Sequence, residues 1–124
     1  MNDATTTVAE LKRLMARFVE QRDWGRYHKP KNLAMSIAIE SGELLELFQW
    51  LDHDECEDFL RRRDRRTMLA DELSDLLGYA FSLANVTGID LAAAFKAEMA
   101  RNRRKYPAHK VKGRYERPVR KEPR

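Results

Sequence analysis

Two apolar stretches of this sequence carry acidic residues with no basic residue beside them. Residues 32–51 and 67–88 are apolar around most of a helix, yet each contains two carboxylates three positions apart. The pairs are Glu40 with Glu43 in the first stretch and Glu72 with Asp75 in the second. A spacing of three places both members of a pair on one helical face, and no Lys or Arg occurs within residues 33–59 or 68–94. Because burying an unpaired carboxylate costs several kcal/mol, the pattern predicts a bound divalent cation.

The ligand types at these positions narrow the choice of metal. An all-oxygen set is typical of hard cations such as Mg²⁺ or Mn²⁺. Di-iron helical bundles use Glu-x-x-His, and neither pair here has that histidine. His53 and His109 lack ligand spacing, which also disfavours zinc. Glu46 follows Glu43 by one turn, and we expect it either to orient a water or to pair with a basic residue of another helix.

Charge and composition bear on the class of protein. Residues 107–124 hold seven basic and two acidic residues, a net charge of +5, so residues 1–106 carry −1 of the total of +4. The basic character belongs to the tail, and the overall charge does not argue for nucleic-acid binding. The single cysteine, Cys56, excludes an internal disulfide and suits a reducing cytosol.

Several sequence patterns are not found in this chain. No apolar run approaches the roughly 18 residues of a membrane span, and the first residues lack a signal-peptide pattern. No glycine-rich P-loop occurs, which argues against a Walker-type nucleotide hydrolase. The expectation is a cytoplasmic enzyme or binding protein without a membrane partner.

Hydrophobic periodicity predicts an all-α fold of four helices, at about residues 8–22, 31–51, 67–88 and 90–106. Thr7 and Glu10 form a capping-box pattern at the first helix. Gly88 is suited to a left-handed cap after the third helix. Between the second and third helices we expect an acidic connection at 52–60, with one helical turn at its end, and a basic run at 61–66 that forms a solvated helix start.

The segment between the first two helices, residues 23–32, carries three large side chains, namely Trp24, Tyr27 and His28. Two interpretations stay open. The aromatic rings plug the end of a helical bundle, or the loop contacts a ligand through its aromatic and basic groups.

The second and third predicted helices are apolar almost all round, which predicts burial on more than one side. Each of the other two helices covers only one side of them. The remaining apolar surface, including Phe48, Trp50 and Leu51, therefore predicts self-association through a second subunit.

Three segments together resemble a known family. RDWGRYHKPKNLAMSIAIESGELLELFQW, ADELSDLLGYAFSLA and NRRKYPAH look like the MazG-like all-α nucleoside triphosphate pyrophosphatases, and within them the dCTP pyrophosphatase branch. The resemblance runs from the first helix to His109. It implies a four-helix protomer that assembles into dimers or tetramers. It also implies Mg²⁺-dependent hydrolysis of a nucleoside triphosphate between the α and β phosphates, which releases a monophosphate and pyrophosphate.

The resemblance assigns roles to particular residues. The metal ligands it implies are Glu40, Glu43, Glu72 and Asp75. The side chains that it places around the base are Trp24, His28, Trp50 and Tyr79. Its phosphate-end motif falls on Asn102 and Arg103, with Arg104 and Tyr106 beside them. On this reading, Glu40, Glu43 and Glu46 would hold the metal and the attacking water.

Two positions depart from the family pattern. Met15 stands where the dCTP branch has a histidine that lines the base pocket, which puts cytosine preference in doubt. Glu98 stands where the family usually has a lysine that faces the phosphates, and Lys96 lies on a different helical face.

The sequence therefore predicts a helical catalytic domain at 1–109 and a basic, flexible tail at 110–124. Its predicted activity is Mg²⁺-dependent pyrophosphohydrolysis of dCTP or a modified pyrimidine deoxynucleotide, in sanitation of the nucleotide pool. One alternative is a dUTP or broad-specificity pyrophosphatase of the same superfamily. The other is a non-enzymatic helical module whose tail binds nucleic acid; it leaves the carboxylate pairs unexplained. The base, the number of metal ions and the choice of dimer or tetramer stay open.

Overall fold

The computed structural model describes residues 1–116, which form six helices and no strand. The helices are α1 (Val8–Glu20), α2 (Pro30–Glu46), α3 (His53–Arg61), α4 (Arg63–Thr87), α5 (Leu91–Lys105) and α6 (Ala108–Val111). The predicted all-α class is thus confirmed. The chain divides into two compact units, Met1–Ile89 and Asp90–Arg124.

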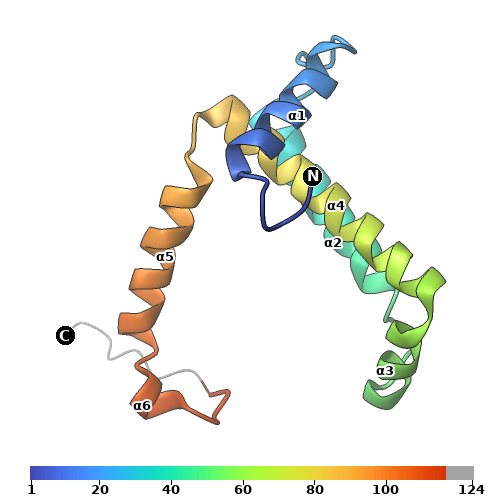
Figure 1. Cartoon of the computed structure of the whole chain (residues 1–124), viewed down its shortest axis with the longest axis vertical. Coiled ribbons are helices and arrows are strands. Elements are labelled where there is room, and N and C mark those ends of the chain that lie inside the picture. Colours follow the sequence, from blue (N-terminus) through green and yellow to red (C-terminus); the bar gives the residue numbers. More distant parts are fainter. Residues whose placement is uncertain (117–124) are drawn as a thin grey trace. The chain divides into compact units, whose positions relative to one another are not determined.

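The first unit is built around α4, which packs against α1, α2 and α3. Figure 1 shows α2 and α4 side by side along most of their length. Two hydrogen bonds join α1 to the end of α4: Asn85 Nδ2 donates to the Lys12 carbonyl at 2.9 Å, and Lys12 Nζ donates to the Ile89 carbonyl at 2.9 Å. Lys12 therefore holds α1 in register with the last turn of α4.

The helix ends follow local sequence signals. Thr7 accepts from the Glu10 amide at 3.2 Å, and Glu10 Oε2 accepts from the Thr7 amide at 2.6 Å, so the predicted capping box is confirmed. The Thr7 amide and the Thr7 hydroxyl both donate to the Glu10 carboxylate, the hydroxyl at 2.8 Å, and these two hydrogen bonds lower the pKa of Glu10 because they stabilise its ionised form. Gly88 ends α4 at φ 69°, the left-handed cap that the sequence predicted.

The region between α2 and α4 differs from the sequence prediction. Helix α2 ends at Glu46 and not near residue 51, and the chain continues in turns. The acidic connection is a nine-residue helix, α3, which a capping box of Asp52 and Glu55 starts. The capping-box pattern was predicted at Thr7, but the same pattern at Asp52 was not. The basic run enters α4, which begins at Arg63.

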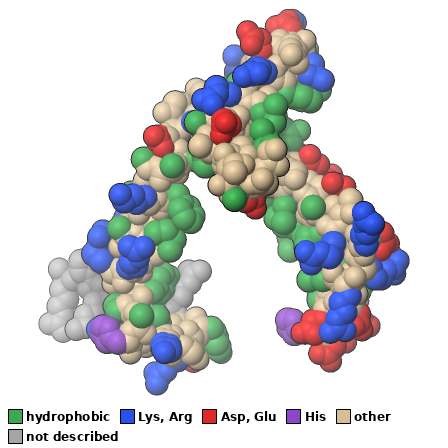
Figure 2. All heavy atoms as spheres, in the orientation of Figure 1, with side chains coloured by type: hydrophobic (Ala, Val, Ile, Leu, Met, Phe, Trp, Pro, Cys, Tyr) green, Lys and Arg blue, Asp and Glu red, His purple; other side chains and the backbone are tan. Residues whose placement is uncertain are grey.

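The side chains of the first unit bury very little within one chain. Among residues 1–116 only Leu33, Ser82 and Ala84 are buried. In the single chain, the two helices predicted to be covered on several sides keep exposed apolar side chains, such as Ile39 (58%) and Leu45 (69%) of α2 and Leu77 (48%) of α4, and their cover by a second subunit stays a prediction. Figure 2 shows charged side chains gathered around α3, with hydrophobic side chains open to solvent elsewhere on the same unit.

The second unit holds α5 and the short α6. Asp90 caps α5 by accepting from the Ala93 amide at 2.9 Å, and the helix ends before Pro107, as predicted. Helix α6 includes the first two residues of the predicted tail, so the chain has a helical turn where none was expected. The 1–109 domain boundary stays a prediction, and residues 117–124 of the tail lie outside the described residues.

Within residues 1–116, no single helix is long and apolar enough to cross a membrane, and α4 and α5 pass a test of length and composition only when they are taken as one bent pair.

Candidate functional site

Three of the predicted metal ligands come together where α2 packs against α4. Glu40 and Glu43 project from one face of α2, and Glu72 projects from α4. Each offers a carboxylate oxygen, and these oxygens all lie within 4.8 Å of one another. The spacing of three residues aligned the first two, and the packing of the two helices added the third. We call these three residues the carboxylate cluster.

Glu40 and Glu72 are half-buried, and one oxygen of each, Oε2, is buried without a hydrogen-bond partner within residues 1–116. No residue of the carboxylate cluster forms an ion pair in this part of the chain. Burial raises the pKa of both Glu40 and Glu72 above its usual value of 4.5, and the Glu43 carboxylate raises each pKa further. The cluster therefore holds negative charge that no ion pair within residues 1–116 neutralises.

Asp75 lies close enough to contribute to this repulsion. Its charge raises the pKa of Glu40 and of Glu72, although more weakly than that of Glu43 does. It lines a cavity together with Glu40. Buried oxygen atoms without partners, mutual repulsion and an all-oxygen donor set fit a hard divalent cation such as Mg²⁺. The residues that would hold it are Glu40, Glu43 and Glu72, with Asp75 at their side.

Beside the cluster, three aromatic rings from two segments are stacked. Trp24 and His28 have ring centroids 6.5 Å apart at 19°, and His28 and Tyr79 have centroids 6.4 Å apart at 30°. The connection that carries Trp24 turns back at Asp23, whose backbone is left-handed (φ 50°). Asp is among the residues that tolerate this conformation best. The connection between α1 and α2 thereby places the rings of Trp24 and His28 next to α4.

These rings and two of the carboxylates, Glu40 and Asp75, line one cavity of about 420 Å³, which we call the acidic cavity. Its lining is Met15, Phe18, Trp24, His28, Glu40, Ser74, Asp75, Gly78 and Tyr79. The volume falls within the usual range for small-molecule sites. The cavity has flat rings at one part and carboxylates at another, so it suits a ligand with a planar group and an anionic group that needs a cation.

Six predicted site residues do not line this cavity. Two of them, Glu43 and Glu72, belong to the carboxylate cluster through Glu40, and the other four lie elsewhere. Trp50 is 86% exposed and, together with Glu46, lines a separate cavity against α3. Glu46 therefore lies apart from the carboxylate cluster in the single chain. Asn102 and Arg103 belong to α5 in the second unit, where Asn102 is half-buried and Arg103 is exposed.

Three lining residues, Phe18, Ser74 and Gly78, had no predicted role in the site. Phe18 was assigned only to the apolar face of the first helix, but its ring meets Trp24 edge-on, with centroids 5.7 Å apart at 73°. Ser74 received no role. No spacing signal pointed to Ser74, because adjacent residues of a helix, such as Ser74 and Asp75, do not lie on the same face.

The model of the MazG-like family matches residues 35–117, which include both carboxylate pairs. This chain belongs to the MazG-like family. The match begins after Trp24 and His28, so the loop that carries them lies outside the matched region.

Other members and solved structures agree with this assignment. The chain is 42% identical to human dCTP pyrophosphatase 1 over 103 residues, and 40% identical to the Bos taurus protein of that name over 107 residues. These matches cover 83% and 86% of this chain, but it spans only 61% and 63% of those relatives. A crystal structure of a pyrophosphatase from Archaeoglobus fulgidus superposes with a TM-score of 0.76 at 40% identity, covering 86% of this chain and 98% of that one.

The carboxylate cluster of this MazG-like protein predicts a pH-dependent stability in the absence of metal. Between pH 4.5 and their raised pKa values, Glu40 and Glu72 keep protons that the unfolded chain has released. The free energy of unfolding therefore falls as the pH rises through that interval. At pH values above this interval, we expect Glu43→Gln to have a higher melting temperature than the wild type. At pH 4 we expect the two melting temperatures to differ little. Both are measured by circular dichroism in EDTA.

Glu57→Gln serves as the control, since Glu57 is an exposed residue of α3, 3.8 Å from Arg61. It removes the same charge away from the cluster. An equal response of both variants at every pH would show that the carboxylate cluster carries no special repulsion.

Proposed function

We propose that this protein is a Mg²⁺-dependent nucleoside triphosphate pyrophosphohydrolase. The observation that carries the proposal is the carboxylate cluster beside the stacked rings of the acidic cavity. A nucleoside triphosphate has a planar base and a polyanionic chain, and the two parts of the cavity suit these two groups. Relatives named dCTP pyrophosphatase 1 support the same activity. Because Mn²⁺ also prefers oxygen ligands, it is the second metal to test.

The chain's own residues then divide the work. Glu40, Glu43 and Glu72 would hold Mg²⁺ from two helices, with Asp75 beside them. The cation would supply neutralisation of phosphate charge and orientation of the phosphoryl group. Because these carboxylates are fixed on packed helices, little reorganisation is needed when substrate arrives. In the hydrolysis, the oxygen of a water would form a bond to the α phosphorus and the water would release its proton, while the bond from the α phosphorus to the α–β bridging oxygen breaks, so that a monophosphate and pyrophosphate leave.

The stacked rings hold the base. Trp24 and Tyr79 lie on opposite sides of His28 in the stack, and Phe18 meets Trp24 edge-on. Stacking alone tolerates every base, at about 1–3 kcal/mol per stacked base in single-strand binding. Selection therefore depends on polar groups at the edge of the base.

Met15 bears on that selection. It lines the acidic cavity and also an apolar groove between α1 and α4, and its sulfur lies 3.7 Å from the position of a Cβ added to Gly78. A thioether offers an adaptable apolar surface and no strong hydrogen bond. We propose substrates among dCTP and modified pyrimidine deoxynucleotides, consistent with a role in sanitation of the nucleotide pool in the cytoplasm. A broad-specificity or dUTP pyrophosphatase is the second candidate, because Met15 offers no strong hydrogen bond to select one base.

We further propose that the protein works as a dimer or tetramer. Large apolar side chains are exposed on α1, α2 and α4, among them Leu14, Met35, Ile39, Leu45 and Leu77. A contiguous exposed apolar surface marks an interaction site. The positions of Trp50 and Glu46, apart from the acidic cavity, leave room for a partner chain to bring such groups to the site.

Two carboxylate variants test the activity. Glu43→Gln and Asp75→Asn remove a charge while they keep the size of the side chain. We expect each to lower Mg²⁺-dependent pyrophosphate release by about a hundredfold or more, since losing a fixed electrostatic contact to a transition state has that order of effect. Near-normal release by both variants, measured with dCTP, would refute the assignment of the site. Release that is absent from the wild type with either metal would favour a non-enzymatic module.

The oligomeric state is measured by light scattering of the full chain at micromolar concentration. We expect the mass of a dimer or tetramer, because one chain leaves its apolar helix faces uncovered. An active monomer at that concentration would show this proposal to be wrong.

Base selection is tested at Met15. We expect the wild type to accept 5-methyl and other 5-substituted pyrimidines at least as well as dCTP. Met15→His restores a polar group at the base pocket and should narrow the profile toward cytosine, as measured by kcat/KM over a panel of deoxynucleotides. A wild-type preference for dCTP over dTTP and dUTP of about a hundredfold or more would mean that Met15 does not set the selection.

A further inference from the structure

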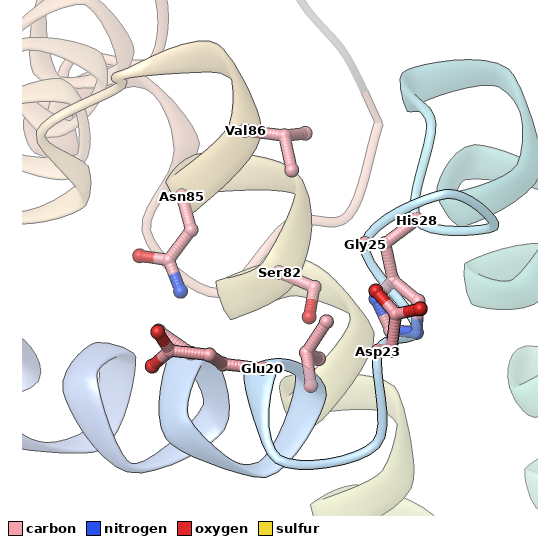
Figure 3. A pocket seen from close by; sticks show the side chains of 9 residues that line it. Glu20, Asp23, Gly25, His28, Ser82, Asn85 and Val86 are labelled. Carbon is pink, nitrogen blue, oxygen red and sulfur yellow. The ribbon is translucent and has the colours of Figure 1, made fainter.

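A second cavity lies between α1, α4 and residues 23–28, the loop that carries Trp24 and His28. We call this loop the aromatic loop, and the cavity lies on the side of it opposite to the acidic cavity. It has a volume of about 390 Å³, and we call it the Ser82 cavity. Figure 3 shows the Ser82 hydroxyl directed away from α4 into this space. Its residues are distinct from those of the acidic cavity except for one, His28.

Ser82 is the unusual member of this lining. It is only 3% exposed, and its Oγ is buried without a hydrogen-bond partner within residues 1–116. A serine inside a helix commonly donates to the carbonyl four residues earlier. Ser41 and Ser74 do so, each at 2.7 Å. The Ser82 hydroxyl is therefore not satisfied by its own helix, although burying such a group unpaired costs about 1–3 kcal/mol.

His28 shows the complementary feature. Its Nδ1 is buried and has no hydrogen-bond partner in the described part of the chain. The ring is the one side chain that lines both cavities, and it is held in the stack between Trp24 and Tyr79. Two buried polar atoms without partners thus belong to residues that line the same cavity.

Neighbouring polar groups of the Ser82 cavity are already engaged. Asn85 Nδ2 donates to the Lys12 carbonyl at 2.9 Å, and Asp23 pairs with Arg26. Both groups lie on the lining, as Figure 3 shows, but they have partners elsewhere. Glu20 also lines the cavity, but it is exposed to solvent. Among the lining residues, Ser82 Oγ and His28 Nδ1 are the buried polar atoms without a partner within residues 1–116. The cavity is roomy enough for water, and a buried water needs two to four polar partners.

We propose that Ser82 is a positioning residue for His28, acting through a water in the Ser82 cavity that links its hydroxyl to His28 Nδ1. A hydrogen bond at one ring nitrogen sets the orientation of a histidine and the tautomer that the other nitrogen presents. The link therefore controls which hydrogen-bonding edge His28 offers in the acidic cavity. This consequence rests on the proposed function: through His28, Ser82 influences how the acidic cavity recognises the base, although Ser82 itself does not line that cavity.

An isosteric pair of variants tests the link. Ser82→Thr keeps the hydroxyl. Ser82→Val introduces a side chain of the same shape as threonine but without the hydroxyl. We expect Ser82→Val to raise KM for dCTP about tenfold, the equivalent of one lost hydrogen bond, with kcat little changed, while Ser82→Thr stays near the wild type. Ser82→Ala removes the hydroxyl without adding volume and should follow Ser82→Val. Equal KM values for the Thr and Val variants would overturn the proposal, because packing alone would then explain the site.

A second measurement does not need catalysis. The chain has three histidines, so the ¹⁵N shifts of the His28 ring can be resolved in the full-length protein without nucleotide. We expect Ser82→Val to move these shifts and Ser82→Thr to preserve them, with His53 and His109 unchanged in both. Unmoved His28 shifts in Ser82→Val would overturn the link.

A double-mutant cycle completes the test. If Ser82 acts only through His28, then Ser82→Val has no further effect on KM in a His28→Ala background. Additive effects would contradict the proposal. If the wild type does not hydrolyse dCTP at all, the proposed function fails, whereas the ring shifts still decide whether Ser82 positions His28.

Discussion

The mutual repulsion of three carboxylates is the constraint on which the rest of this structure depends. Helices α2 and α4 bring Glu40, Glu43 and Glu72 together, and no basic side chain of residues 1–116 forms an ion pair with them. Two of their oxygens are buried without a partner. Such an arrangement is unfavourable in the protein alone and becomes favourable when a cation binds, which is typical of sites that are selected for function and not for stability.

The aromatic loop gives this acidic surface a second chemical character. Residues 21–29 fold back on α4, where a left-handed Asp23 and a hydrogen bond from Asn32 Nδ2 to the Tyr27 carbonyl at 3.0 Å hold the turn. Rings and carboxylates then share one cavity. Because the loop rests on packed helices, its rings are preorganised, and His28 connects this cavity with the one that Ser82 lines.

The exposed apolar side chains follow from the same organisation. Helices α1, α2, α3 and α4 form the first unit, and within residues 1–116 much of their apolar surface stays exposed to solvent. In this MazG-like protein, large side chains such as Leu45 stay open to solvent while Leu33 and Ala84 are buried. The proposed contacts between chains would cover the apolar faces of α2 and α4, which the few buried residues of 1–116 leave open.

The sequence by itself determined the features that depend on local geometry. Capping residues, the left-handed turn at Gly88 and the alignment of Glu40 with Glu43 follow from hydrogen bonds and side-chain spacing within a few residues. Only the tertiary structure decided which groups from different helices meet. It joined Glu72 to the α2 pair, separated Trp50 and Glu46 from them, and placed Ser82 and His28 on one cavity. Such contacts depend on how whole helices pack, and no spacing along the chain specifies them.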